Sequence, residues 1–111
     1  MSKNKILTLL GFAAKAQKLS FGNSAVLWAI KTNKSRLAVI SGEISEKSRK
    51  EVQYHAEKNN IKTIVLKGID IKTVSDAVGK NCGIISVNDS GFADAILENY
   101  EAIKGGNADD E

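Results

Sequence analysis

The stretch LSFGNSAVLWAIKTNKSRLAVISG, residues 19–42, contains the signals that decide the fold. Its first three residues can form a short strand, which the following glycine ends. A helix is then expected to begin at Asn23 or Ser24, because both residue types are good N-caps, and to run to about Thr32. The apolar run at residues 37–40 is rich in β-formers and predicts a buried strand. The order strand, helix, strand is typical of an α/β protein.

Helix and strand signals alternate along the rest of the chain as well. Further helices are predicted over residues 3–17, 45–59, 73–78 and 92–103, and further buried strands over 63–66 and 83–87. This alternation favours a three-layer α/β/α sandwich around a small, mostly four-stranded mixed sheet. We expect residues 1–104 to form a single domain and residues 105–111 to be a disordered acidic tail.

Length and composition limit the class of protein. With 111 residues, 42% of them apolar and 26% charged, the chain is expected to form one globular domain. We also predict that it is a monomer. No apolar run is long enough to cross a bilayer, and no unbroken apolar segment follows the basic N-terminus, so neither a membrane span nor a signal peptide is expected. The single cysteine, Cys82, excludes an internal disulfide. Together these features predict a cytoplasmic protein.

Positive charge is concentrated in the first part of the chain. Residues 1–80 contain 15 Lys and Arg against 6 Asp and Glu, whereas residues 81–111 contain 1 against 7. No acidic residue precedes Glu43. This asymmetry indicates an anionic partner such as a nucleic acid, although a lysine-rich solvated surface has the same composition.

Signatures of catalytic and metal sites are missing from the sequence. It contains neither a G-x-x-x-x-G-K-[ST] phosphate loop nor a G-x-G-x-x-G pattern. One histidine and one cysteine cannot supply a zinc cluster of the usual spacing. His55 is interpreted as a half-exposed helix residue rather than a base, and Cys82 as a small buried hydrophobe rather than a nucleophile. We therefore expect a protein that is not an enzyme and that binds no metal or other cofactor.

The only tryptophan is predicted to be at least partly exposed. On a helical wheel, Val26, Leu27 and Ile30 share one face, and Trp28 falls nearly opposite them beside Lys31. An exposed aromatic ring beside basic groups can stack on an unpaired base. It can also anchor a protein partner or pack against the first helix or the loops, so the wheel alone leaves three interpretations open.

Two further features are candidates for contacts with RNA. Lys31, Lys34 and Arg36 cluster at the end of the same helix, where they can contact phosphates or complement the helix dipole. The loop at residues 79–83, GKNCG, joins a helix to a strand, and its two glycines permit close approach of the backbone to a ligand. Glycines also end helices, so the loop on its own does not distinguish the two roles.

Three segments, taken in order and with their spacing, resemble the kink-turn-binding ribosomal protein superfamily. They are GNSAVLWAIKTNKSRLAVIS at 22–41, residues 45–66 with KSRKEVQYHA at 47–56 as their most characteristic part, and VGKNCGIISVNDSGFADAI at 78–96. The likeness covers roughly residues 5–100, and the short bacterial YlxQ-like proteins, described as RNA-binding, are the branch that the chain resembles. Members of this superfamily have an α/β/α sandwich fold, which agrees with the pattern of helices and strands.

The resemblance implies that the chain binds structured RNA, either kink-turn-like or ribosomal, without catalysis and in connection with the ribosome or translation. Family members grip RNA with the N-terminus of the second helix and the loop before the last strand. The corresponding positions are Gly22, Asn23, Ser24 and Ala25, continuing to Trp28, and the loop residues Lys80, Asn81 and Cys82. The alternative is a protein-interaction module of the translation machinery on the same fold, with Trp28 at the interface.

The chain departs from the family pattern at three of these positions. Family members usually have Gly-x-Asn-Glu, followed by a lysine on the same face of the helix. Ser24 stands at the position of the Asn, Ala25 at that of the Glu and Trp28 at that of the Lys. Alanine cannot accept hydrogen bonds from guanine edges, and tryptophan cannot pair with a phosphate. The expected target is therefore structured RNA in general.

Overall fold

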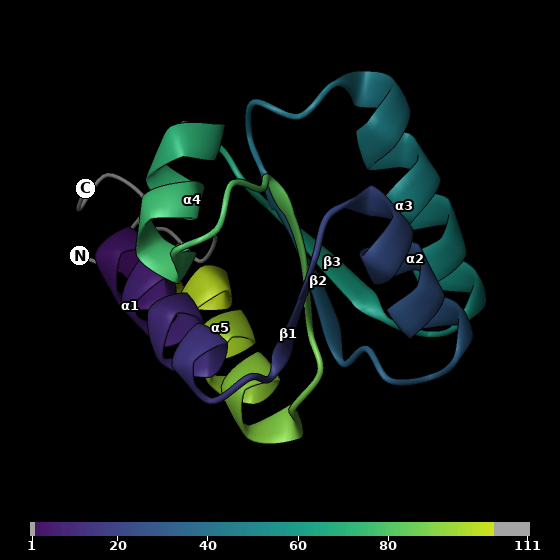
Figure 1. Ribbon diagram of the computed structural model, residues 1–111, viewed down its shortest axis with the longest axis horizontal. Helices are drawn as coiled ribbons and strands as arrows, with labels where there is room; N and C mark the ends of the chain where they lie inside the picture. Colours follow the sequence, from purple (N-terminus) through teal and green to yellow (C-terminus); the bar gives the residue numbers. More distant parts are fainter. Residues whose placement is uncertain (1, 104–111) are drawn as a thin grey trace.

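The computed structural model describes residues 2–103, in which helices and strands alternate as the sequence predicts (Figure 1). In chain order the elements are α1 (Ser2–Lys15), β1 (Leu19–Phe21), α2 (Asn23–Lys31), β2 (Leu37–Ser41), α3 (Glu46–Lys58), β3 (Lys62–Leu66), α4 (Ile71–Val78), β4 (Ile84–Val87) and α5 (Ser90–Ala102). The predicted acidic tail at 105–111 lies outside the described residues.

The four strands form one mixed sheet in the order β1-β4-β2-β3. β4 pairs antiparallel with both β1 and β2, and β2 pairs parallel with β3. In this register Phe21 lies opposite Ile85, and Ile85 lies opposite Val39 on the other side. The last strand of the chain is therefore central, and it connects the first strand to the rest of the sheet.

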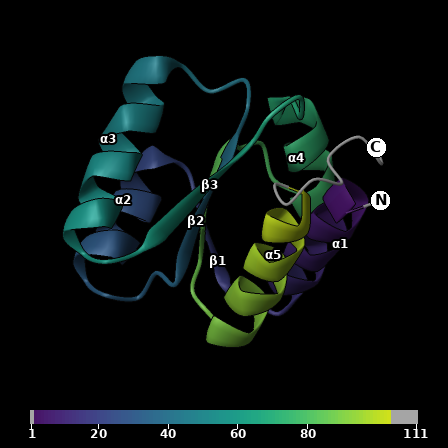
Figure 2. The same cartoon turned by 180° about the vertical axis from the view of Figure 1, so that it is seen from behind.

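The helices cover both faces of the sheet and form the predicted three layers. Figures 1 and 2 show α2 and α3 on one face and α1, α4 and α5 on the other. Alternate residues of the buried strands serve the two cores: Leu37 and Val39 pack toward α1 and α5, whereas Ala38 and Ile40 pack toward α2 and α3. The α/β/α sandwich with a four-stranded mixed sheet is thus confirmed.

Two helices begin two residues earlier than the sequence pattern predicts. α4 begins at Ile71 because Asp70 caps it, with its carboxylate accepting a hydrogen bond from the N–H of Thr73 at 2.8 Å. α5 begins at Ser90 for the same reason, since Asp89 accepts a hydrogen bond from the N–H of Phe92 at 2.9 Å. A carboxylate at an N-cap satisfies a backbone donor that the helix leaves free, so each helix extends back to its aspartate.

Candidate nucleic-acid interface

The start of α2 lies beside the loop that precedes β4. The N–H of Gly22 donates a hydrogen bond to the carbonyl of Ile84 at 2.9 Å. The ammonium group of Lys80 lies over the ring of Phe21, 5.5 Å from its centroid. The antiparallel pairing of β1 with β4 therefore joins two segments that are about sixty residues apart in the sequence. We call the surface formed by residues 22–25 and 79–81 the helix-start surface.

Gly22 is the N-cap of α2, which corrects the prediction that Asn23 or Ser24 would fill this position. Its φ is 92°, a conformation that glycine adopts at little cost and that the pattern of side chains does not indicate. Asn23 is the first residue of the helix, and its amide donates to Glu51 of α3 at 3.4 Å instead of capping. No side chain caps α2, so its first N–H groups and the positive end of its dipole face the surface.

The residues after Gly22 are open to solvent. Asn23, Ser24 and Ala25 are all exposed in the first turn of α2. The Ser24 hydroxyl can donate and accept hydrogen bonds, whereas Ala25 offers only its backbone N–H. The chemistry of this turn is therefore that of a cluster of backbone donors with one hydroxyl, which suits phosphate oxygens and acceptor groups on base edges.

The loop at 79–83 presents two polar side chains and buries the third. Lys80 and Asn81 are exposed, whereas Cys82 is only 8% exposed. The Ser75 hydroxyl bonds both to the N–H and to the carbonyl of Cys82, each at 3.0 Å, and so fixes the loop against α4. Of the three loop positions predicted to contact RNA, Lys80 and Asn81 reach the surface, and the thiol of Cys82 does not.

Burial should make Cys82 slow to react. Burial raises the pKa of its thiol above the usual value, against a smaller opposite effect of the Lys80 charge. A raised pKa leaves less thiolate at a given pH. Alkylation of Cys82 should therefore need a higher pH than alkylation of an ordinary thiol to reach the same rate. With iodoacetamide at pH 8, we expect the folded protein to react at least about tenfold more slowly than the urea-unfolded chain, as followed by mass spectrometry. Equal rates would show that the thiol is exposed.

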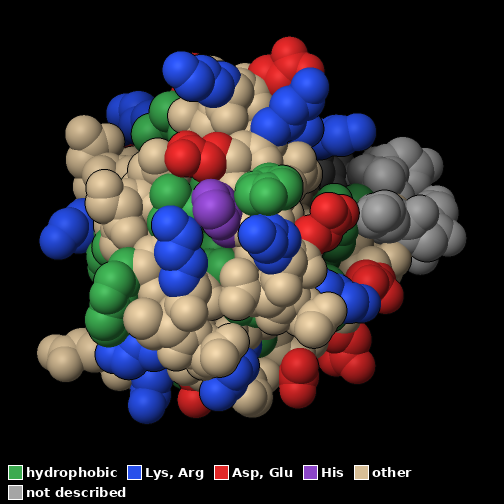
Figure 3. All heavy atoms as spheres, turned by 90° about the vertical axis from the view of Figure 1, so that its right-hand side faces the viewer, with side chains coloured by type: hydrophobic (Ala, Val, Ile, Leu, Met, Phe, Trp, Pro, Cys, Tyr) green, Lys and Arg blue, Asp and Glu red, His purple; other side chains and the backbone are tan. Residues whose placement is uncertain are grey.

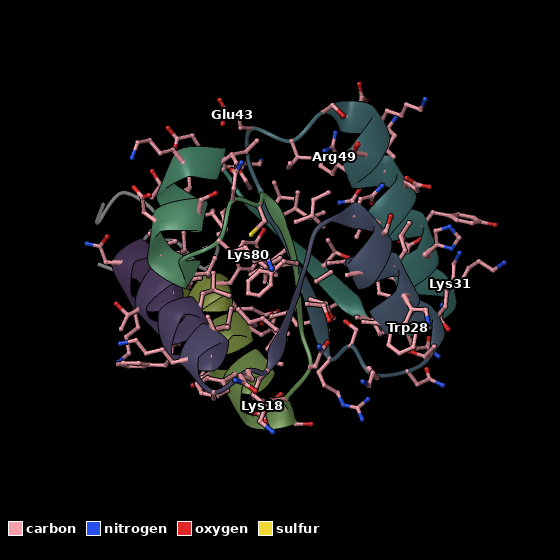
Figure 4. All side chains as sticks on the ribbon, viewed as in Figure 1. Lys18, Trp28, Lys31, Glu43, Arg49 and Lys80 are labelled. Carbon is pink, nitrogen blue, oxygen red and sulfur yellow. The ribbon has the colours of Figure 1, made fainter. Side chains whose placement is uncertain are left out.

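The other predicted residues form a second group toward the far end of α2. Trp28 is 57% exposed, as the helical wheel predicts, and the ammonium group of Lys34 lies 5.2 Å from its ring centroid. Lys31 is exposed on the next turn, and the exposed Arg36 donates to the carbonyl of Asn33 at 3.3 Å. Figure 4 shows Trp28 and Lys31 well apart from Lys80. The predicted site residues are therefore not one patch.

Two side chains of α3 were not singled out from the sequence. Arg49 is half-buried, and its guanidinium group donates a hydrogen bond to the Gln53 side chain one turn later, at 3.5 Å (Figure 4). Tyr54 is 57% exposed on the same helix. A helical wheel of this segment would have found Tyr54, because it falls on the face opposite the buried Val52 and Ala56.

The described part of the chain contains no cluster of metal ligands and no membrane-crossing helix. Among residues 2–103, no three His, Cys, Asp or Glu side chains lie close enough together to hold a metal ion. No helix in this range is both long enough and apolar enough to cross a bilayer.

Comparison with known proteins finds a matching family and similar structures. The sequence profile of the ribosomal protein L7Ae/L30e/S12e/Gadd45 family matches residues 4–96. A protein of unknown function from Bacillus halodurans C has a similar structure, with a TM-score of 0.83 and 26% identity over 87% of this chain and 97% of the other. The Giardia lamblia 15.5kD RNA binding protein has a TM-score of 0.74 and 12% identity, over 94% of this chain and 88% of the other.

No curated protein sequence matches the chain at a significant level. The family profile nevertheless spans every element from α1 to the first half of α5, including both segments of the helix-start surface. The chain belongs to the ribosomal protein L7Ae/L30e/S12e/Gadd45 family.

Proposed function

We propose that this protein binds structured RNA through the helix-start surface and does so without catalysis. The observation that carries the proposal is that a helix N-terminus without a side-chain cap lies beside the loop that exposes Lys80 and Asn81. Membership of a family that includes ribosomal proteins supports it, and so does the likeness in fold to a protein described as RNA-binding.

Each part of the surface has a suitable partner in RNA. The free N–H groups of residues 23–25 can bind phosphate oxygens, and the helix dipole favours their negative charge. Lys80 can contact a second phosphate, and the Asn81 amide can hydrogen-bond to a base edge. In a regular A-form duplex the bases are stacked and the major groove is too deep and narrow for side chains to read, whereas a bent or looped RNA exposes unstacked bases to such a surface. The chemistry therefore favours structured RNA, including kink-turn-like RNA, over a plain duplex.

The expected setting is the ribosome or translation. The family takes its description from ribosomal proteins, and the basic part of the chain suits an RNA-rich partner. We propose that the protein acts in the cytoplasm as a monomer, with ribosomal or other non-coding RNA as its ligand and with ribosomal or translation factors as possible neighbours.

Backbone amide shifts in NMR spectra test where RNA binds. On addition of a kink-turn RNA, we expect the largest changes at Asn23, Ser24 and Ala25 of α2 and at Lys80 and Asn81 of the loop, because their N–H groups lie at the helix-start surface. Amides of β3, at the opposite edge of the sheet from β1, should change little. Changes concentrated at β3 would contradict the proposed site.

A further inference from the structure

The outer side of the α2 and α3 layer exposes two aromatic rings. Three large hydrophobic side chains are exposed within residues 2–103, and two of them, Trp28 and Tyr54, lie on these neighbouring helices. Both helices run in the same direction, as Figures 1 and 2 show, and Asn23 at the start of α2 donates to Glu51 in the middle of α3.

Each of these rings has a lysine beside it. The Lys34 ammonium lies 5.2 Å from the Trp28 ring centroid, and the Lys58 ammonium lies 5.3 Å from that of Tyr54. The ring of His55 meets Tyr54 edge-on, with centroids 5.2 Å apart. Within the described residues, the lysines that form ion pairs are Lys50, Lys62 and Lys72, and neither Lys34 nor Lys58 is among them.

Figure 3 shows this face directly. Lysine and arginine side chains and hydrophobic side chains surround the histidine, one acidic side chain lies directly beside it, and most other acidic side chains lie toward the margins of the view. Lys31, exposed on α2, adds a further positive charge to this face. The face thus combines flat rings with several positive charges.

We propose that this face is a second RNA site, which stacks unpaired bases on Trp28 and Tyr54 while Lys31, Lys34 and Lys58 contact the adjoining phosphates. The inference rests on the proposed function, because it takes RNA as the ligand and adds a contact for nucleotides that flank the structured part. Stacking of a base on an exposed aromatic ring contributes roughly 1–3 kcal/mol and does not depend on which base is present.

The geometry selects single-stranded rather than duplex RNA. Packed helices have axes about 8–10 Å apart, so rings on separate helices can receive two splayed bases but not one continuous stack. In a duplex the base faces are already covered by their neighbours. The composition also favours RNA over a protein partner, because lysine is depleted in the cores of protein–protein interfaces, whereas here lysines adjoin both rings.

Fluorescence of Trp28 offers a direct test, since it is the only tryptophan in the chain. We expect an oligoribonucleotide of eight unpaired adenosines to quench the emission in a saturable manner, and a duplex of the same length to quench it little. Tyr54→Ala should weaken binding of the oligonucleotide about tenfold, and Tyr54→Phe should restore most of the affinity because the ring is kept. The matched control is Phe12→Ala, which removes the third exposed ring, 54% exposed on α1. This variant should bind the oligonucleotide with the affinity of the parent protein.

The variants separate this inference from the proposed function. Lys80→Ala should weaken binding of a kink-turn RNA without flanks and leave binding of the adenosine oligonucleotide unchanged, and Tyr54→Ala should do the reverse.

The second site is overturned if the parent binds the kink-turn RNA but the oligonucleotide neither quenches Trp28 nor binds. It is also overturned if Tyr54→Ala binds the oligonucleotide as tightly as the parent does. The exposed rings would then suit a protein partner instead. If the oligonucleotide binds and the kink-turn RNA does not, the proposed function at the helix-start surface fails while this site stands.

Discussion

Replacing Ile85 with alanine is expected to lower the free energy of unfolding by about 2–5 kcal/mol. Ile85 is fully buried in the central strand β4, where it lies opposite Phe21 of β1 and Val39 of β2. Removing most of its side chain loses burial of apolar surface and leaves a cavity between the sheet and the helices on that face. Urea denaturation followed by circular dichroism measures the change.

A matched variant at the same position keeps most of the volume. Ile85→Val should lower the free energy of unfolding by only about 0.5–1.5 kcal/mol, because it removes one methylene group. If the alanine variant lost no more than the valine variant, Ile85 would not be the tightly packed residue that the structure shows. A loss of about 5 kcal/mol equals the whole stability of many small domains, so the alanine variant should be examined at low temperature.

Reversing the charge at Lys80 should have the largest effect on binding. In the Lys80→Glu variant we expect affinity for a structured RNA to fall about 10–100-fold at low ionic strength, because a charge-assisted contact to phosphate is replaced by repulsion. The difference between variant and parent should shrink as salt is added, since exposed charges are screened. Fluorescence anisotropy with a labelled RNA at two salt concentrations gives both quantities.

The control for Lys80→Glu is the same substitution at a lysine far from the helix-start surface. Lys62 lies at the start of the edge strand β3, where its only described ion pair, to Glu101 at 4.0 Å, is exposed and contributes little stability. Lys62→Glu changes the net charge by the same amount and should reduce affinity only slightly. Equal losses for the two variants would mean that net charge, and not the position of Lys80, governs binding.

Local signals in the sequence predicted most of the fold. Apolar periodicity located the five helices and the buried strands, and the helical wheel correctly placed Trp28 at the surface. The starts of α4 and α5 were placed too late, although Asp70 and Asp89 are residues that often cap helices. These errors are small because a cap moves a helix end by a turn at most and does not move the apolar face.

The arrangement of the candidate site depended on information that local patterns do not contain. The positive φ of Gly22 decides where α2 begins and frees Asn23 to reach Glu51. Because β1 pairs with β4, Lys80 lies near the start of α2. The lysines at the end of α2 lie on a different part of the surface. That Trp28 and Tyr54 lie on neighbouring helices likewise follows from the packing of α2 against α3, which are separate in the sequence.

The most direct test of RNA recognition is a titration of the full chain with a kink-turn RNA and with a plain duplex of the same length, each at two salt concentrations. Because the helix-start surface suits unstacked bases as well as phosphates, we predict that the kink-turn RNA binds at least about tenfold more tightly and that this ratio persists at the higher salt. Equal affinity for the two RNAs, falling in parallel as salt is added, would mean that the protein reads only phosphate charge, and would contradict recognition of RNA structure by this surface.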